Sequence, residues 1–312
     1  MDRAPIYSRA GTLSTETDRV WWTRARKELQ GEMAAVARGS REDAEKQGTN
    51  GAGAPNRTLE KGLLLLGLFD MDHPDWSLRE LREISGLSKT TTLRLVKTLE
   101  SLEYLECEPR TGRYHLGTSI LKAVYVSLSH SELVRRAHPF LQALADETTE
   151  SVSLTVWTDR GPLLIDMVPT SRIFKPQIWL GMVLPGLGSA NARVHAAFGP
   201  ERIREELLST PQAARTPHTI TDPAHLRDDL SKVQREGVAV ERQEWDLSMG
   251  AVAAPVFGPD GSVRAALAVV LPIERSGESE LQTHSDAVKR TAQALSREMG
   301  YGGNDAQETT VA

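Results

Sequence analysis

Cations and hydroxyls are concentrated in one short segment, SGLSKTTTLRLVKTLE, at residues 85–100. It contains Lys89, Arg94 and Lys97, and it has no acidic residue before Glu100. Arginine, lysine, threonine and serine side chains can bond to base edges or phosphates in a DNA groove. On a helix that starts at Lys89, positions 90, 94, 97 and 101 share one face and carry Thr, Arg, Lys and Ser. The spacing therefore predicts a helix that reads the major groove with this face.

Three consecutive threonines at positions 90–92 are unusual at the start of a helix, because β-branched residues lower helix propensity. That cost is only about a few tenths of a kcal/mol per residue. The amides of a first helical turn have no partner within the helix and can point toward a phosphate, so Thr90 and Thr91 can add hydroxyl contacts there. Thr92 is expected to turn inward together with the apolar residues Leu95, Val96 and Leu99.

The elements before this helix would position it. Ser77 with Glu80 three residues later predicts a capping box at the start of a short helix, and Gly86 ends that helix. Ser88 can cap the next helix after a turn of only a few residues. Two short helices joined by a tight turn that contains glycine are typical of a helix-turn-helix. An apolar helical run at Leu59–Phe69 precedes the pair.

Two short strands predicted at 104–107 and 113–116 enclose the turn Pro109–Gly112 and form a hairpin directly after the second helix. A hairpin in this place is a wing, with Arg110 and Arg113 in or beside its tip. The residues predicted to contact DNA are Ser88, Lys89, Thr90, Thr91, Arg94, Lys97, Arg110 and Arg113.

Net charge alone does not indicate DNA binding. The formal net charge is −5, and residues 56–118 contain nine Lys or Arg against ten Asp or Glu. The hypothesis of DNA binding rests on the local separation of cations from acids, because a helix that is merely solvated would not usually exclude acids from a whole segment. A helix-turn-helix that serves protein contacts is the alternative.

Composition indicates a soluble globular protein of 312 residues, with 39% hydrophobic and 25% charged residues. Cys107 is the single cysteine, which excludes a disulfide framework and a cysteine-based zinc site. The sequence has no apolar run long enough for a membrane helix and no signal-peptide pattern at its start. These features predict a cytoplasmic location.

Both ends of the chain look unlike the rest. Residues 1–55 are interpreted as an extension that is partly helical, over Asp18–Ala37, and partly flexible, over Gly39–Pro55. An extension without a function is the alternative for this segment. Residues 302–312 are expected to form a flexible tail.

The rest of the chain predicts a linker helix at 118–130 and a domain at 131–301 that mixes strands and helices, so the fold class is α+β. The expected strands are 151–157, 162–168, 175–182, 238–241, 251–257 and 262–271. The expected helices are 132–147, 189–198, 201–208, 223–236 and 280–299.

Enzyme signatures are weak in this sequence. Gly186–Asn191 resembles a dinucleotide loop, but the third glycine is absent and no βαβ unit surrounds it. There is no Gly-x-Ser-x-Gly elbow and no P-loop, and the eight histidines have no His or Cys partner at i+3 or i+4. We therefore predict no catalytic residue, no metal site and no cofactor.

Two long motifs resemble a known family. "LRELREISGLSKTTTLRLVKTLESLEYLE" followed by "TGRYHLG" is similar to the N-terminal winged helix-turn-helix of the IclR family of bacterial transcription regulators, over residues 56–117. "TITDPAHLRDDLSKVQREGVAVERQEW" and "GAVAAPVFGPDGSVRAALAVVLP" are similar to the family's effector-binding domain, to about Tyr301. The resemblance implies a GAF-like domain with a mixed sheet, joined to the DNA-binding domain by a linker helix. It also implies a dimer or dimer of dimers on a pseudo-palindromic operator.

The resemblance also implies a set of effector-binding positions. The loop and helix start after the third strand correspond to 187–192, an acidic position falls on Glu241, and strand positions fall on Ala251, Ala268 and Val270. The last three stand where the family often has a cysteine and two serines, so this pocket offers fewer partners to a small carboxylate. We therefore expect an aromatic or acyl effector. The predicted effector-binding residues are Leu187, Ser189, Ala190, Asn191, Glu241, Ala251, Ala268, Val270, Met167 and Trp179, with ordinary core packing as the alternative for Leu187, Met167 and Trp179.

Overall fold

The computed structural model describes residues 56–71, 73–172, 176, 178–184 and 186–302. The chain divides into two compact units, Met1–Val126 and Ser127–Ala312. The expected extension at 1–55 lies outside the described residues, and so does the expected tail at 302–312 apart from Gly302.

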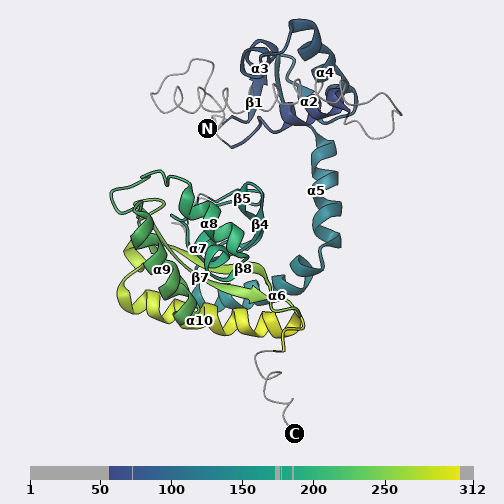
Figure 1. The fold of residues 1–312 in the computed structure, drawn as a ribbon. Helices are drawn as coiled ribbons and strands as arrows, with labels where there is room; N and C mark the ends of the chain where they lie inside the picture. The colour runs from purple at the N-terminus through teal and green to yellow at the C-terminus, as the bar shows by residue number, and fades with distance from the viewer. Residues whose placement is uncertain (1–55, 72, 173–175, 177, 185, 303–312) are drawn as a thin grey trace, which may run out of the picture. The chain divides into compact units, whose positions relative to one another are not determined.

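The described part of the first unit contains three helices and three short strands before the helix that leaves it (Figure 1). These elements are α2 (Arg57–Leu66), β1 (Asp75–Ser77), α3 (Leu78–Ser85), α4 (Lys89–Ser101), β2 (Leu105–Cys107), β3 (Arg113–Leu116) and α5 (Thr118–His130). Their common core consists of buried residues from every element before α5. The core includes Leu65, Trp76, Leu81, Ile84, Val96, Leu105 and Tyr114. The winged helix-turn-helix expected from the sequence is confirmed.

The predicted caps of the two central helices are confirmed. Ser77 Oγ accepts from the amide of Glu80, and the Glu80 carboxylate accepts from the amide of Ser77. Gly86 ends α3 with φ of 70°, in the left-handed region where a residue without Cβ avoids strain. Ser88 Oγ then accepts from the amide of Thr91 and starts α4. The turn between the helices is short, because Gly86 ends α3 and Ser88, two residues later, caps the start of α4.

Strand β1 was not predicted. It pairs antiparallel with β3, so the wing is a three-stranded sheet in the order β1-β3-β2. The strand is only three residues long and runs directly into the capping serine, which hid its extended pattern. Trp76 lies at its centre, buried, and donates its indole N–H to the carbonyl of Leu68 at 3.1 Å. The wing is therefore anchored to the segment that follows α2.

The second unit is built on a five-stranded sheet with helices on both faces. Its strands are β4 (Ser151–Thr158), β5 (Gly161–Val168), β6 (Ala239–Arg242), β7 (Met249–Phe257) and β8 (Val263–Pro272). Its helices are α6 (Glu132–Thr148), α7 (Ala190–Phe198), α8 (Glu201–Ser209), α9 (Pro223–Glu236) and α10 (Glu278–Glu298), with a single 3₁₀ turn, η1 (Ile273–Arg275). The strand order is β5-β4-β8-β7-β6.

Two details of the sheet differ from the expectation, although the α+β fold class is confirmed. Every pair of neighbouring strands in this sheet is antiparallel, so it is not a mixed sheet. The third strand expected at 175–182 is absent from the described part of that segment. A turn with Gly181 at φ of 83° interrupts it, and residues 181–184 bond to β5 only through scattered backbone contacts and one isolated bridge at Val183.

Strand β8 divides the core of this unit into two layers, because its side chains alternate between the sheet faces. Leu267 and Val269 pack in the layer covered by α6 and α10, whereas Ala268 and Val270 pack in the layer covered by α7 and α9. Figure 1 shows α6 and α10 on one side of the sheet and α7, α8 and α9 on the other. The small side chains on the second face leave room between the sheet and α7.

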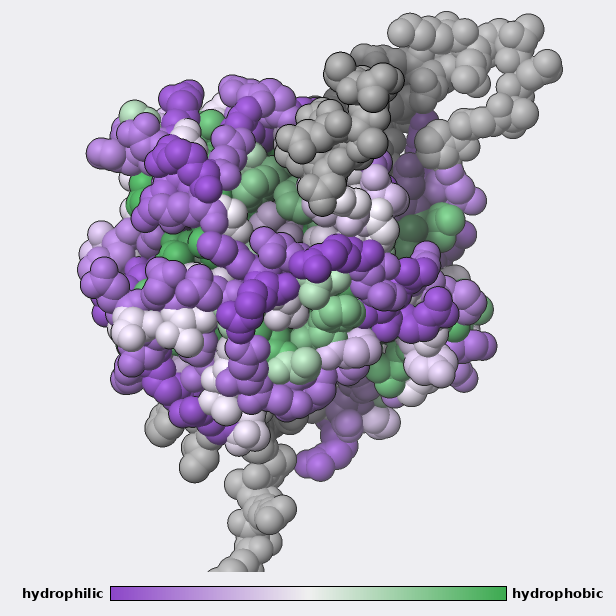
Figure 2. Space-filling view, turned by 90° about the horizontal axis from the view of Figure 1, so that it is seen from below, coloured by the Kyte–Doolittle hydropathy of each residue, from purple (hydrophilic) through white to green (hydrophobic). Residues whose placement is uncertain are grey.

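The surface follows the amphipathic pattern of the helices. The face seen in Figure 2 is mostly hydrophilic, with hydrophobic residues in small separate patches. On α10, for example, Leu281, Val288 and Leu295 are buried at helical spacing, while the polar residues between them point outward. Within the described ranges, no helix combines the length and the apolar character needed to cross a bilayer.

The capping box of α3 gives a stability prediction. Ser77→Ala removes the acceptor for the Glu80 amide and should destabilise the first unit by about 1 kcal/mol. The measurement is the first thermal unfolding transition followed by circular dichroism. Ser129→Ala, an exposed serine on α5, is the matched control and should leave that transition in place. Equal effects of the two substitutions would contradict the role given to the cap.

Candidate functional site

Helix α4 has the two faces that the sequence predicted. Thr92, Leu95 and Val96 are buried against the domain core, and Leu99 is partly buried against it. The other face is open, and its exposed residues include Lys89, Thr90, Arg94, Lys97 and Ser101, with Leu93 and Thr98 also exposed. A row of cations and hydroxyls therefore lies on the solvent side of the helix.

The three threonines have different environments. Thr90 is exposed and makes no hydrogen bond through its side chain to any described residue. Thr91 is half-buried, with its hydroxyl 2.9 Å from Ser88 Oγ, so it belongs to the helix cap. Thr92 is fully buried and donates its hydroxyl to the carbonyl of Ser88 at 3.1 Å. The expectation that Thr92 packs inward is confirmed, and Thr90 is the threonine free for an external contact.

The five predicted cations differ in how far they are engaged. Lys89, Arg94 and Arg110 are exposed, and among the described residues none of them has an ion-pair partner. Lys97 lies 2.6 Å from Glu100 and 5.9 Å from the centroid of the Tyr114 ring, which its ammonium faces. Lys89 and Arg94 on α4 and Arg110 in the wing turn are thus the cations ready for a phosphate or a base.

Arg113 stands apart from the other predicted DNA contacts, because its guanidinium is engaged inside the domain. It bonds to the carboxylate of Asp75, donates to the carbonyl of Asp75 at 3.0 Å, and lies 3.0 Å from Glu80. Only 27% of its side chain is exposed. These contacts tie β3 to β1 and to the capping box of α3. Arg113 therefore holds the wing against the helix-turn-helix.

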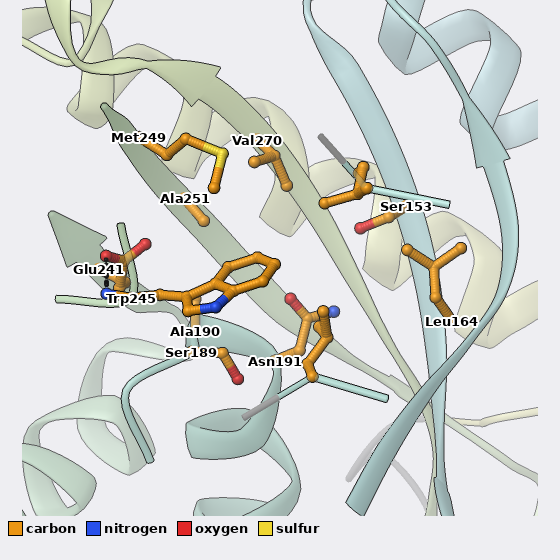
Figure 3. A pocket seen from close by; sticks show the side chains of 12 residues that line it. Ser153, Leu164, Ser189, Ala190, Asn191, Glu241, Trp245, Met249, Ala251 and Val270 are labelled. Carbon is orange, nitrogen blue, oxygen red and sulfur yellow. Dashed lines mark hydrogen bonds between the residues drawn. The ribbon is translucent and has the colours of Figure 1, made fainter. Parts of the chain in front are cut away.

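A pocket lies between the sheet and the start of α7 in the second unit. Its volume is about 360 Å³, including the part open to solvent. It is lined by Ser153, Leu164, Ile178, Leu184, Ser189, Ala190, Asn191, Glu241, Trp245, Met249, Ala251 and Val270. Figure 3 shows the indole of Trp245 across its centre, between Ala190 on α7 and the strands that carry Ala251 and Val270.

Strand register brings distant predicted residues together. Glu241 pairs with Ala251 across β6 and β7, and Ala251 pairs with Val270 across β7 and β8. These three residues form a row across the sheet, and α7 places Ser189 and Asn191 opposite that row (Figure 3). Six of the predicted effector positions therefore line one pocket. They are Ser189, Ala190, Asn191, Glu241, Ala251 and Val270.

The other four predicted positions lie outside this lining. Leu187 and Ala268 are fully buried within the core layer beneath α7. Met167 is partly buried against the same layer, and Trp179 is half-buried in the segment after β5. Leu187 and Met167 thus follow the core-packing alternative.

Six lining residues were not predicted, namely Ser153, Leu164, Ile178, Leu184, Trp245 and Met249. They come from β4, β5 and β7 and from two connecting segments, the one between β5 and α7 and the one between β6 and β7. The alternation of side chains along β4 and β5 could have indicated that Ser153 and Leu164 face the pocket, since every second residue of a strand shares a face. No local pattern marked Trp245, which enters the pocket from the loop between β6 and β7.

A buried arginine, also missed, supports the pocket wall. Arg193 on α7 is 1% exposed, and its guanidinium donates to the carbonyls of Leu187 at 2.8 Å and Val240 at 3.2 Å. It also bonds to the Glu244 carboxylate and lies 3.3 Å from Asp229. One side chain thus joins α7, the loop before it, the outer edge of β6 and the loop that carries Trp245.

Glu241 is a buried carboxyl beside this cluster. It is 2% exposed, and its Oε1 accepts from the amides of Glu244 at 2.6 Å and Trp245 at 3.1 Å. Burial raises the pKa of Glu241 to about 7, although the two amide hydrogen bonds oppose this shift. The carboxyl can therefore gain or lose a proton near neutral pH.

A second buried polar chain starts at Asn191. Its Nδ2 donates to Thr155 Oγ1 at 3.0 Å, and Thr155 Oγ1 lies 3.4 Å from Nε2 of His195. Burial lowers the pKa of His195 to about 4, so its imidazole is neutral at pH 7. This chain fixes the orientation of the Asn191 amide at the pocket.

The pKa of Glu241 generates a prediction on stability. Because that pKa is about 7 in the folded chain and 4.5 for an ordinary glutamate, the fold loses stability as pH rises from about 4.5 to about 7. Glu241→Gln removes this loss. Its free energy of unfolding relative to wild type should therefore be up to about 3 kcal/mol more favourable at pH 8 than at pH 4.5.

Urea unfolding of the second unit at the two pH values measures this difference. Glu236→Gln, an exposed carboxyl at the end of α9, is the control and should show no comparable change with pH. The same difference between Glu241→Gln and wild type at both pH values would contradict the raised pKa.

Comparisons with known proteins agree with both units. Residues 125–297 match the family model of the bacterial transcriptional regulator IclR C-terminal, and residues 58–109 match that of the IclR helix-turn-helix domain. The DNA-binding transcriptional repressor YiaJ of Escherichia coli K12 is 29% identical over 252 residues, which span 80% of this chain and 89% of that protein.

Two solved structures show the same fold. The structure of Pseudomonas aeruginosa HmgR is 29% identical, with a TM-score of 0.62 over 79% of this chain and 100% of that one. An IclR homologue from Microbacterium hydrocarbonoxydans, complexed with 4-hydroxybenzoate, is 23% identical with a TM-score of 0.67, over 78% of this chain and 98% of that one.

The matches extend through the helix-turn-helix and the domain that contains the pocket, and the similar proteins are transcription regulators rather than enzymes. A DNA-binding domain followed by an effector-binding domain is the organisation of a regulator whose operator binding responds to a small molecule. The chain belongs to the IclR family of transcriptional regulators.

Proposed function

We propose that this regulator reads its operator with the exposed face of α4, supported by the wing. Lys89, Thr90 and Arg94 are the proposed groove contacts on α4, and Arg110 is the proposed phosphate contact from the wing. The observation that carries this assignment is the exposure of three cations without ion-pair partners among the described residues. Ser88 and Thr91 build the first turn of α4, and Arg113 positions the wing.

The proposed functions of the three segments follow the domain boundaries predicted from the sequence. Residues 56–117 bind DNA, residues 118–130 form the linker helix and residues 131–301 bind the effector. We propose that the regulator acts as a homodimer or a dimer of dimers on a pseudo-palindromic operator, so that each half-site receives one α4. Helix α5 supports this assembly, since Leu121 and Tyr125 on it are 71% and 74% exposed and offer an apolar surface to a second copy.

We propose the pocket beside α7 as the effector site, and an aromatic or acyl compound as the effector. Most of its lining is apolar, including Leu164, Ile178, Met249 and Val270, and the Trp245 indole offers a flat face to a ring. The homologue solved with 4-hydroxybenzoate shows that a domain of this fold holds such a ring in that protein.

Arg94→Ala tests the proposed DNA face. Loss of a base or phosphate contact at the centre of α4 should weaken binding to the regulator's own upstream region at least tenfold. The measurement is a mobility-shift titration at several salt concentrations, because phosphate contacts make the affinity fall as salt rises. Lys232→Ala on α9, an exposed cation of the effector-binding domain, is the control and should bind as wild type does.

Two outcomes would contradict this assignment. If the wild-type protein fails to retard its upstream region at low salt, operator binding at that region is excluded. If Arg94→Ala binds as tightly as Lys232→Ala, the exposed face of α4 serves another contact, such as one to a protein.

The proposed assembly predicts the mass in solution. One chain has a mass of 34.3 kDa, so light scattering after gel filtration should give about twice or four times that value. Leu121→Glu on α5 should shift the population toward smaller species, because it puts a charge into the proposed apolar contact. Lys122→Glu, the adjacent exposed position, is the control. A monomeric mass at all concentrations would rule out the assembly.

A further inference from the structure

Three buried side chains keep one polar atom unpaired beside the pocket. Ser153, Asn191 and Glu241 are 1%, 2% and 2% exposed. The Asn191 amide nitrogen is used by Thr155 and Oε1 of Glu241 by two backbone amides, which leaves Asn191 Oδ1 and Glu241 Oε2. Neither of these oxygens, nor Oγ of Ser153, has a hydrogen-bond partner among the described residues, and all three side chains line the pocket (Figure 3).

These free atoms are mainly hydrogen-bond acceptors. Asn191 Oδ1 and an ionised Glu241 Oε2 can only accept, whereas the Ser153 hydroxyl can donate or accept. A bound molecule that donates to Asn191 and Glu241 would therefore meet acceptor oxygens that no described residue occupies.

Positive charge is missing from the same surface. The described lining contains no lysine, arginine or histidine, and Glu241 is its single ionisable residue. The nearest buried cation, Arg193, already bonds to two carbonyls and to Glu244 and lies beside Asp229. An anion that entered the pocket would meet a carboxyl and no free counterion, which is costly in a buried site.

At the start of α7, a side chain of the protein already bonds to one of the free amides. A helix N-terminus attracts anions through its free amides, but here Ser189 Oγ accepts from the amide of Ala192 at 3.3 Å. The Ser189 hydroxyl in turn donates to the carbonyl of Gly186 at 3.2 Å. The cap oxygen of the chain itself thus takes up one of the free amides at this helix end.

We propose that the effector of this regulator is an uncharged ring or chain compound that carries hydroxyl donors, rather than a carboxylate. This inference rests on the proposed effector site and names its ligand class. The apolar part of the ligand contacts Trp245, Met249 and Val270, and its hydroxyls donate to Asn191 and Glu241. The carboxyl of Glu241 determines which class of ligand binds, because it accepts a hydrogen bond from a donor and repels a second anion.

Two probes of the same shape test the proposal by isothermal titration calorimetry on the full-length protein at pH 8. They are 4-hydroxybenzyl alcohol and 4-hydroxybenzoate, which differ mainly in the charge of one substituent. At pH 8 most of Glu241 is ionised, because its pKa is about 7. The alcohol should bind at least tenfold more tightly than the acid.

Glu241→Gln and Glu236→Gln separate the role of this carboxyl from that of general charge. Glu241→Gln keeps the size of the side chain and removes its charge, so the preference for the alcohol should fall at least tenfold. Glu236→Gln, outside the pocket, should leave the preference unchanged. Circular dichroism and thermal unfolding of each variant establish that it is folded.

Three results would overturn the inference. They are equal or tighter binding of 4-hydroxybenzoate by the wild-type protein, no binding of either probe, or the same preference in Glu241→Gln as in wild type. None of them touches operator binding, which the mobility-shift titration measures independently. Loss of operator binding would instead remove the proposed function.

Discussion

The buried guanidinium of Arg193 is the interaction on which the ligand-binding half of the protein depends. It holds α7, the outer edge of β6 and the β6–β7 loop in one arrangement, through Leu187, Val240 and Glu244. Taking such a cation out of water is costly, and only a complete set of acceptors offsets that cost. Loss of one charged partner typically costs about 3–5 kcal/mol, because the other charge stays buried. The loop that carries Trp245 is therefore fixed by the same contacts that hold α7 in place.

The DNA-binding half relies on a different device, a series of local caps. Ser77, Gly86 and Ser88 end and begin helices within a few residues, so α4 follows α3 at a tight turn. Arg113 then connects β3 to β1 and to Glu80, which joins the wing to the capping box. Among the described residues, Lys89 and Arg94 on α4 have no ion-pair partner, whereas Asp75 and Glu80 pair with Arg113 and Glu100 pairs with Lys97. A domain with a slightly negative total charge can thereby present a positive face.

Most of the local structure was readable from the chain, and part of the pocket was readable through family resemblance. The faces of α4, both caps and the helix at 223–236 were predicted because each depends on residues within one or two turns. Glu241, Ala251 and Val270 were placed at one site by resemblance, and the register of three strands explains why they meet. The strand expected at 175–182 failed because Gly181 turns the chain where the apolar pattern continued.

What the sequence by itself determined is where most helices and turns lie, since these follow from periodicity, capping and glycine conformations along a short stretch. Only the tertiary structure decided which charges are free. Arg94 and Arg113 are the same residue type in the sequence, yet Arg94 is exposed and Arg113 is bonded to Asp75 and Glu80. Arg193 on α7 looked like an ordinary basic residue and proved to be fully buried. The reason is that burial and ion pairing depend on residues as far as 38 positions away for Arg113 and 51 positions away for Arg193, which no local pattern encodes.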